Sequence, residues 1–184
     1  MELEIVNVVS TADLKQSVNL NEISKLGHVI FDQEIYGGRV AYLKKPEMHG
    51  KVTIFSSGKL ISVGTKSPEQ AEEDLLTTHE TLVASNIITP TEITTTLRNI
   101  VAVLRLPNQI DLEIIASHQN VIYEPEQFPA AIMKSTDPKV TYLIFGSGKI
   151  VILGTKSLRE LQEASQKITN ILKNINRITQ DSPE

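Results

Sequence analysis

The chain contains a direct repeat, and its two copies align at most of their landmarks. Residues 54–67 return as residues 144–157, with the same Phe-x-Ser-Gly-Lys turn and the same Gly-Thr-Lys-Ser ending. A unit of this length exceeds the roughly 20–45 residues of a solenoid repeat and is small for an independent domain. We therefore expect two repeats, residues 1–90 and 91–184, that share one sheet about a pseudo-two-fold axis.

Each repeat has the pattern of a strand, a short helix, a group of strands and a long helix. The Ser-Gly pairs at 57–58 and 147–148 are typical of tight hairpin turns. The long helices begin at Ser67 and Ser157, where a cap residue is followed by early acid. Four helical segments are too few to cover both faces, so we expect an antiparallel sheet with every long helix on one side. A polar tail should follow after about residue 178.

Composition and length are those of an ordinary globular protein. The chain has 184 residues, of which 40% are hydrophobic and 22% are charged. No stretch approaches the roughly 20 apolar residues that a membrane span needs, and the N-terminus lacks a signal pattern. We therefore expect no membrane association and an intracellular protein.

The residue types that bind metals or attack substrates are scarce. The absence of cysteine excludes disulfides, thiol chemistry and Cys-ligated zinc. The four histidines, His28, His49, His79 and His118, lie far apart in sequence and show no metal-ligand spacing. We therefore expect no metal, no cofactor and no enzymatic activity.

The charge is distributed unevenly along the chain. A formal net charge of −4 argues against non-specific coating of nucleic acid. A run of four acidic residues lies within residues 69–74, which indicates either an acidic helix side of a polarised molecule or a merely solvated helix face. Basic residues fall in the strand-rich segments: Arg39, Lys44, Lys45, Lys51, Lys59, Lys134, Lys139 and Lys149.

The sheet face without helices should carry apolar and aromatic side chains. Strand alternation places Phe55 on one face with Ile61 and Val63, and the second repeat matches it with Phe145. A single strand phenylalanine usually belongs to the core. However, the aromatic residue recurs beside the same turn in both repeats, with Tyr36 or Phe128 upstream, and an exposed apolar face needs a partner.

These residues resemble the TATA-box-binding protein family, in the short archaeal form. The resemblance runs from about Glu4 to Arg177 and is strongest in the second repeat. There, residues 123–129 (Tyr-Glu-Pro-Glu-Gln-Phe-Pro) and 143–149 (Leu-Ile-Phe-Gly-Ser-Gly-Lys) are similar to the two signature stretches of the family. The paired asparagines Asn7 and Asn99 also match.

The resemblance implies an α+β fold in which two direct repeats form a pseudo-two-fold saddle. Its curved antiparallel sheet would have about ten strands, with helices on the convex face and the concave face in the DNA minor groove. The implied base-floor residues are Asn7, Val9, Val63, Asn99, Val101 and Leu153; the aromatic wedges are Tyr36, Phe55, Phe128 and Phe145; and the phosphate contacts are Ser57, Lys59, Lys134, Lys139, Ser147 and Lys149.

The resemblance also implies partners and a location. The protein would be a general initiation factor that binds and bends A·T-rich promoter DNA. Glu124 and Glu126 resemble the family's contact for a transcription factor B-type partner, through which RNA polymerase is recruited indirectly; a solvated acidic turn is the alternative. The uncovered face also allows a homodimer in the absence of DNA. We expect a cytoplasmic, nucleoid-associated protein in an archaeon, or a nuclear one in a eukaryote.

Several positions depart from the family pattern and indicate a divergent paralogue. Val63 and Leu153 replace two central threonines, Tyr36 replaces a phenylalanine, Tyr42 replaces a basic residue, and the loop 45–51 is longer. The loss of the two central threonines favours a second hypothesis, a protein-interaction regulator with weak or altered DNA specificity. A third, a fragment of a DNA repair enzyme or nuclease, lacks a nucleophile, carboxylate cluster or metal set.

Overall fold

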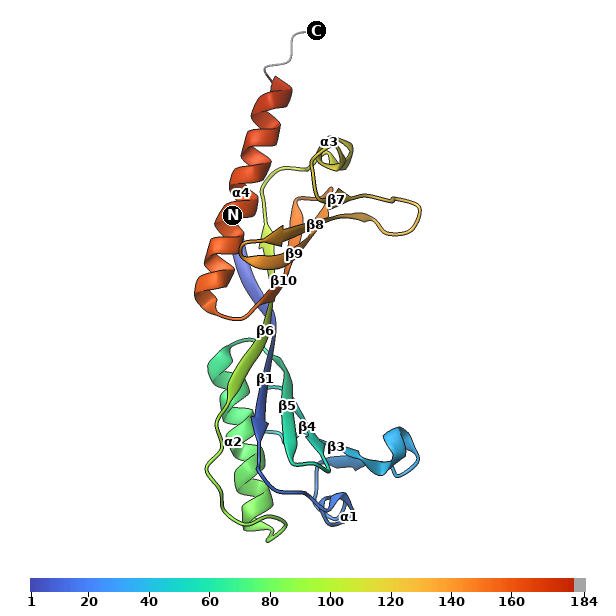
Figure 1. Cartoon of the computed structure of the whole chain (residues 1–184), viewed down its shortest axis with the longest axis vertical. Coiled ribbons are helices and arrows are strands. Elements are labelled where there is room, and N and C mark those ends of the chain that lie inside the picture. The colour runs from blue at the N-terminus through green and yellow to red at the C-terminus, as the bar shows by residue number, and fades with distance from the viewer. Residues whose placement is uncertain (181–184) are drawn as a thin grey trace. The chain divides into compact units, whose positions relative to one another are not determined.

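The computed structural model describes the backbone of residues 1–180 and the side chains of residues 1–175 (Figure 1). The polar tail predicted after about residue 178 falls at the end of this range, and residues 181–184 lie outside it. The elements are, in order, β1 (Glu2–Asp13), α1 (Leu20–Ile23), β2 (Val29–Phe31), the 3-10 turn η1 (Ile35–Gly38), β3 (Val40–Leu43), β4 (Lys51–Phe55), β5 (Lys59–Thr65), α2 (Pro68–Ala84), β6 (Thr96–Arg105), α3 (Leu112–Ala116), β7 (Val121–Ile122), β8 (Ala130–Thr136), β9 (Lys139–Phe145), β10 (Lys149–Thr155) and α4 (Leu158–Gln180).

The chain forms two compact units that do not follow the repeats exactly. The first-repeat unit comprises Asn7–Arg98, and the second-repeat unit combines Met1–Val6 with the chain from Asn99 onward. Strands β1 and β6 therefore each contribute residues to both units. The hydrogen-bonded order of the ten strands is β2-β3-β4-β5-β1-β6-β10-β9-β8-β7.

In the first-repeat unit, helix α2 covers one face of the strands. Alternation buries Val52, Ile54 and Leu60 completely, and Leu75 and Leu82 of α2 are equally buried. Full burial of such a side chain contributes about 1.5–3 kcal/mol. The intervening strand residues are only partly buried, so the opposite face has no helical cover.

The second-repeat unit has the same arrangement, with α4 on one side of its strands (Figure 1). The buried strand residues include Tyr142, Ile144 and Ile152, and α4 contributes Leu161 and Ile168 to the same core. The long helices thus cover one face in each unit, as the sequence predicted.

The helix starts follow one design in both repeats. The Ser67 hydroxyl accepts a hydrogen bond from Gln70 N, and the Gln70 side chain accepts one from Lys66 N at 2.9 Å. In the second repeat, Ser157 Oγ accepts from Glu160 N at 3.1 Å. These bonds satisfy backbone N–H groups that have no partner within a helix.

The two repeats connect helix to sheet differently. The buried carboxylate of Asp74 on α2 accepts hydrogen bonds from His49 N at 2.9 Å and Gly50 N at 2.6 Å. It thereby holds the longer loop between β3 and β4. In the second repeat, the Tyr142 hydroxyl donates to Ala164 O at 3.0 Å, and burial raises the pKa of Tyr142 to about 12. Each device fixes one helix over its strands.

The hairpin turns before β5 and β10 require glycine. Gly58 has φ +89° and Gly148 has φ +86°. A Cβ on Gly58 would collide with the Gln16 carbonyl oxygen, and one on Gly148 would collide with that of Asn108. Glycine, as predicted at both turns, is therefore required because of its positive φ and because a side chain would not fit. Within the described residues, no helix is long and apolar enough to cross a membrane.

Candidate nucleic-acid interface

The helix-free face of the first-repeat unit carries a row of apolar and hydroxyl side chains. Cross-strand pairing aligns Thr53 of β4 with Ile61 of β5 and Thr11 of β1. Val63 pairs with Lys51 on the same face, and Phe55 lies at the hairpin end of β4. All are half-buried except Lys51, which is exposed. Val9 is half-buried and lies two residues before Thr11 on β1, so it has the same orientation. The predicted residues Val9, Phe55 and Val63 thus share a face that no helix covers.

The second-repeat unit repeats this surface with fewer hydroxyls. Leu143, Val151 and Val103 align across β9, β10 and β6, and Leu153 pairs with Val101. The helix-free face of the second-repeat unit is therefore almost entirely aliphatic along these strands. Such a face can contact a flat apolar surface but offers few hydrogen-bond donors of its own.

The paired asparagines have one geometry in both units. Asn7 Oδ1 accepts a hydrogen bond from Gly64 N at 2.8 Å, and Asn99 Oδ1 accepts one from Gly154 N at 3.1 Å. Each bond occupies the amide oxygen, so the NH₂ group is the part of the side chain left for an external acceptor. Each unit thus holds one asparagine side chain in a fixed orientation, with its NH₂ group available as a hydrogen-bond donor.

A β-bulge in β5 places Gly64 next to the strand that carries Asn7, and a bulge in β10 places Gly154 next to the strand that carries Asn99. The register shifts between Val8 and Ser10 opposite β5, and between Leu153 and Thr155 opposite β6. The extra residues Gly64 and Gly154 have φ +89° and +101°, which glycine adopts at little cost. The bulge leaves an N–H group out of the strand ladder, and the asparagine side chain satisfies it.

The aromatic pairs differ between the units. In the second-repeat unit, the rings of Phe128 and Phe145 lie 6.2 Å apart at 65°, an edge-to-face contact. The ammonium group of Lys149 lies 5.4 Å from the centre of the Phe145 ring. This predicted pair is thus brought together.

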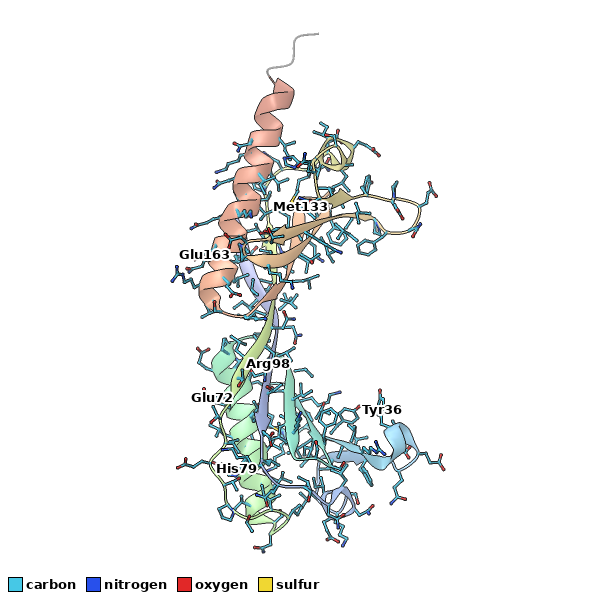
Figure 2. The ribbon with its side chains drawn as sticks, viewed as in Figure 1. Tyr36, Glu72, His79, Arg98, Met133 and Glu163 are labelled. Atoms are coloured by element: carbon cyan, nitrogen blue, oxygen red, sulfur yellow. The ribbon has the colours of Figure 1, made fainter. Side chains whose placement is uncertain are left out.

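Tyr36 makes no corresponding ring contact with Phe55 among the described residues. Its side chain is 69% exposed at the tip of the segment between β2 and β3 (Figure 2). Tyr36, Gly37 and Gly38 all have positive φ, at 52°, 61° and 67°. The left-handed conformation costs a non-glycine residue about 1–2 kcal/mol. The resemblance implied a wedge role for all four aromatic residues, and among the described residues only Phe128 and Phe145 are in ring contact.

The predicted phosphate-binding residues lie around the edges of these faces. Ser57, Lys59, Lys134, Lys139 and Ser147 are exposed, and Lys149 is half-buried against Phe145. Lys134 pairs with Thr141 across β8 and β9, which places it on the helix-free side with Leu153. The units therefore present cations beside their apolar faces.

Cross-strand pairing reveals charged residues that sequence reasoning missed. Lys59 pairs with Asp13, whereas its counterpart Lys149 pairs with Arg105. Asp13 and Arg105 occupy equivalent positions, six residues after Asn7 and Asn99. Aligning the two repeats at their asparagines would have shown that an acidic residue in one repeat corresponds to a basic residue in the other. The cross-strand positions of the two lysines could not be predicted, because the strand register depends on the bulges.

The acidic pair Glu124 and Glu126 lies on an exposed turn. Gln127 N and Phe128 N both donate to Glu124 O, at 2.9 and 3.0 Å. This turn leads into Phe128, and both glutamates are exposed. Within the described residues, no cluster of His, Cys, Asp and Glu could hold a metal ion.

Comparison with known proteins identifies the family. The model of the family described as transcription factor TFIID (or TATA-binding protein, TBP) matches residues 2–83 and again residues 94–175. The TATA-box-binding protein of Cenarchaeum symbiosum is 37% identical over 92% of this chain and 93% of the relative. That of Methanothermobacter thermautotrophicus is 36% identical, over 91% and 92%.

A solved structure extends the likeness to the fold. The structure of Methanococcus jannaschii TBP has a TM-score of 0.84 and 32% sequence identity, covering 95% of this chain and 99% of that one. Together with the double family match and the ten-strand order, this confirms the predicted α+β fold of two direct repeats. The chain therefore belongs to the family of transcription factor TFIID, or TATA-binding protein.

Proposed function

We propose that this protein is a general transcription initiation factor that binds A·T-rich promoter DNA through the minor groove. The observation that carries the proposal is the pair of fixed amides, Asn7 and Asn99, beside apolar strand faces. The names of the relatives support it, since they are TATA-box-binding proteins. The protein acts by binding and not by catalysis.

The chemistry of the faces fits an A·T minor groove. That groove presents only the acceptors A N3 and T O2, whereas a G·C pair adds the donor amino group of guanine. The NH₂ groups of Asn7 and Asn99 can donate to those acceptors without distinguishing A·T from T·A. Aliphatic residues such as Val9, Val101 and Leu153 fit the groove floor, and the guanine amino group would clash with them.

The aromatic side chains support bending. Apolar side chains that insert between base steps unstack them and bend the duplex, a mode of binding described for this family. Phe128 and Phe145, whose rings are in contact, would form the wedge of the second repeat. Tyr36 and Phe55, which are not in ring contact, would insert as separate side chains in the first repeat. Lys59, Lys134, Lys139 and Lys149, with Ser57 and Ser147, then bond the flanking phosphates. Residues 1–90 and 91–184 would each bind one half of the site.

The bound protein then recruits a transcription factor B-type partner, and RNA polymerase through it. Glu124 and Glu126 support this proposal, because their turn is held by backbone bonds while both residues are exposed. The site of action is the genome, in the cytoplasm with the nucleoid in an archaeon or in the nucleus of a eukaryote.

Selection of binding sites from random duplex DNA tests the proposal. The selected sites should be A·T-rich, and a ligand that fills the A·T minor groove should displace the protein. A pool that stays random, or binding that survives a filled groove, would contradict minor-groove recognition.

One observation favours a second candidate function, a saddle-fold regulator that acts mainly on proteins. Val63 and Leu153 leave the centre of each face without the hydroxyls that the resemblance implies. Titration with duplex DNA at several salt concentrations separates the two functions. A DNA binder shows a steep linear fall of log K with log salt. The regulator shows weak binding with no A·T preference, and a homodimer through the helix-free faces would then persist when DNA is added.

A further inference from the structure

The helix-free face of the first-repeat unit holds an open cleft of about 440 Å³ that includes an arginine. Its lining comes from β1, β4, β5, β6 and the segments beside them, and it contains Thr11, Phe55, Lys59 and Arg98. Phe55 and Lys59 are already among the proposed DNA contacts. Arg98 therefore lies beside the proposed binding surface, on β6 (Figure 2).

The Arg98 side chain is held in place but not neutralised. Its Nε donates a hydrogen bond to Thr11 Oγ1 at 2.9 Å. The residue is exposed, and no ion pair joins it to a carboxylate among the described residues. The bond uses one of five guanidinium donors and leaves the two terminal NH₂ groups for another acceptor. Arg98 is thus a pre-oriented cation on an open face.

This arginine has no equivalent in the other repeat. Arg98 directly precedes Asn99, and the residue that precedes Asn7 is Val6. Thr11 likewise has the aliphatic counterpart Val103. The Thr11–Arg98 contact therefore distinguishes one repeat from the other.

We propose that Arg98 is a specificity-determining residue that donates hydrogen bonds to base acceptors in the minor groove, and that Thr11 positions its guanidinium. This inference rests on the proposed function, because it requires that the helix-free face bind duplex DNA. A guanidinium has donors only, so it matches a groove edge that shows only acceptors. The amino group of guanine places a donor against it. Arg98 therefore sharpens the preference for A·T in one half of the site only.

Four variants separate base reading from simple phosphate attraction. The probe is a selected A·T-rich duplex, compared with duplexes that carry one G·C pair or one inosine·C pair at successive positions. Inosine lacks the guanine amino group, so it isolates that group. Arg159→Gln is the control, because Arg159 is an exposed arginine on α4, which covers the opposite side of its unit.

Arg98→Gln should weaken binding about three- to tenfold, and the salt slope of log K should fall by no more than the value of about 0.9 for one lost phosphate contact. It should also reduce the penalty for G·C, relative to inosine·C, at positions in one half of the site. Arg98→Lys should keep the salt slope but lose that discrimination, because an ammonium group is a point charge without a rigid fork. Arg159→Gln should change neither quantity.

Thr11→Ala should keep the salt slope and lose the discrimination, and Thr11→Ser should restore it, since serine keeps the hydroxyl. Discrimination unchanged in both Arg98 variants would overturn the inference while leaving the proposed function intact. If Arg98→Lys discriminates as well as the wild type, Arg98 is only a phosphate contact, and the base-reading role is wrong. If the wild-type protein shows no A·T preference, the proposed function fails, and this inference fails with it.

Discussion

At the scale of single residues, the amide oxygen and the amide nitrogen of Asn99 have different tasks. The oxygen accepts from Gly154 N and so stabilises the bulge, while the NH₂ group is the proposed donor to DNA. The same division holds at Asn7 and Gly64. A substitution that keeps the oxygen but removes the donor therefore separates folding from binding.

Asn99→Asp should leave stability nearly unchanged but weaken binding to A·T-rich duplex. A carboxylate still accepts from Gly154 N, so the free energy of unfolding should change by less than about 1 kcal/mol. The lost donor should weaken binding at least about threefold, and repulsion by the phosphates adds to this. Asn170→Asp on α4 adds the same charge to the helix-covered side and should bind like the wild type. Equal losses in both variants would show that only charge matters.

The aliphatic residues Val63 and Leu153 should limit sequence preference. Their methyl groups fit an A·T floor but cannot donate, and each missing hydrogen bond is worth about 0.5–1.5 kcal/mol. Val63→Thr combined with Leu153→Thr should raise the ratio of affinity for selected over random DNA. A ratio that is unchanged or lower would mean that neither position contacts bases.

At the scale of elements, Tyr142 connects β9 to α4 through its bond to Ala164 O. Tyr142→Phe should lower the free energy of unfolding by about 0.5–1.5 kcal/mol, measured by urea denaturation near neutral pH. DNA affinity should not change, because Tyr142 lies on the covered face. A loss of affinity without a loss of stability would contradict this assignment.

The raised pKa of Tyr142 also predicts a pH dependence. The folded-state value of about 12 lies above the ordinary value of 10.0, so the unfolded chain releases the proton first. The stability that this difference provides is complete below pH 10 and is lost as the pH rises toward 12. Tyr142→Phe should reduce the decline over that interval. An identical decline in both proteins would contradict the burial of an un-ionised hydroxyl.

The sequence predicted the helix starts and the hairpin turns, because these features depend on residues that are close together in the chain. The cap residues Ser67 and Ser157 start helices, and Gly58 and Gly148 form turns, because each requirement involves neighbours in the chain. Cross-strand neighbours were not predicted, since register depends on bulges that insert one residue. The pairing of Lys59 with Asp13 therefore emerged only from the structure, as did the contact of Arg98 with Thr11.

The position of Tyr36 shows the same limit for the candidate site. Alignment with Phe128 predicted a second wedge pair, but the two glycines that follow Tyr36 permit a left-handed turn. In the second repeat, Pro129 follows the phenylalanine instead. A repeat indicates which residues correspond, but the local conformation decides whether they meet.

At the scale of the whole molecule, the two repeats are unequal in charge. Lys59 has the acidic residue Asp13 as its neighbour on the adjacent strand, whereas Lys149 has the basic residue Arg105. Asp13→Asn should therefore strengthen DNA binding, and Arg105→Gln should weaken it and lower the salt slope by about 0.9. Fluorescence anisotropy at several salt concentrations measures both. Equal affinities for wild type and both variants would exclude this edge from the phosphate contacts.

The proposed bending of A·T-rich DNA by the aromatic side chains can be measured directly. Energy transfer between dyes at the two ends of a short selected duplex should rise when protein is added. Phe145→Ala should reduce the rise more than Tyr36→Ala at saturating protein, because Phe145 belongs to the assembled pair and Tyr36 does not. Binding without any change in energy transfer would show that the protein does not bend the duplex.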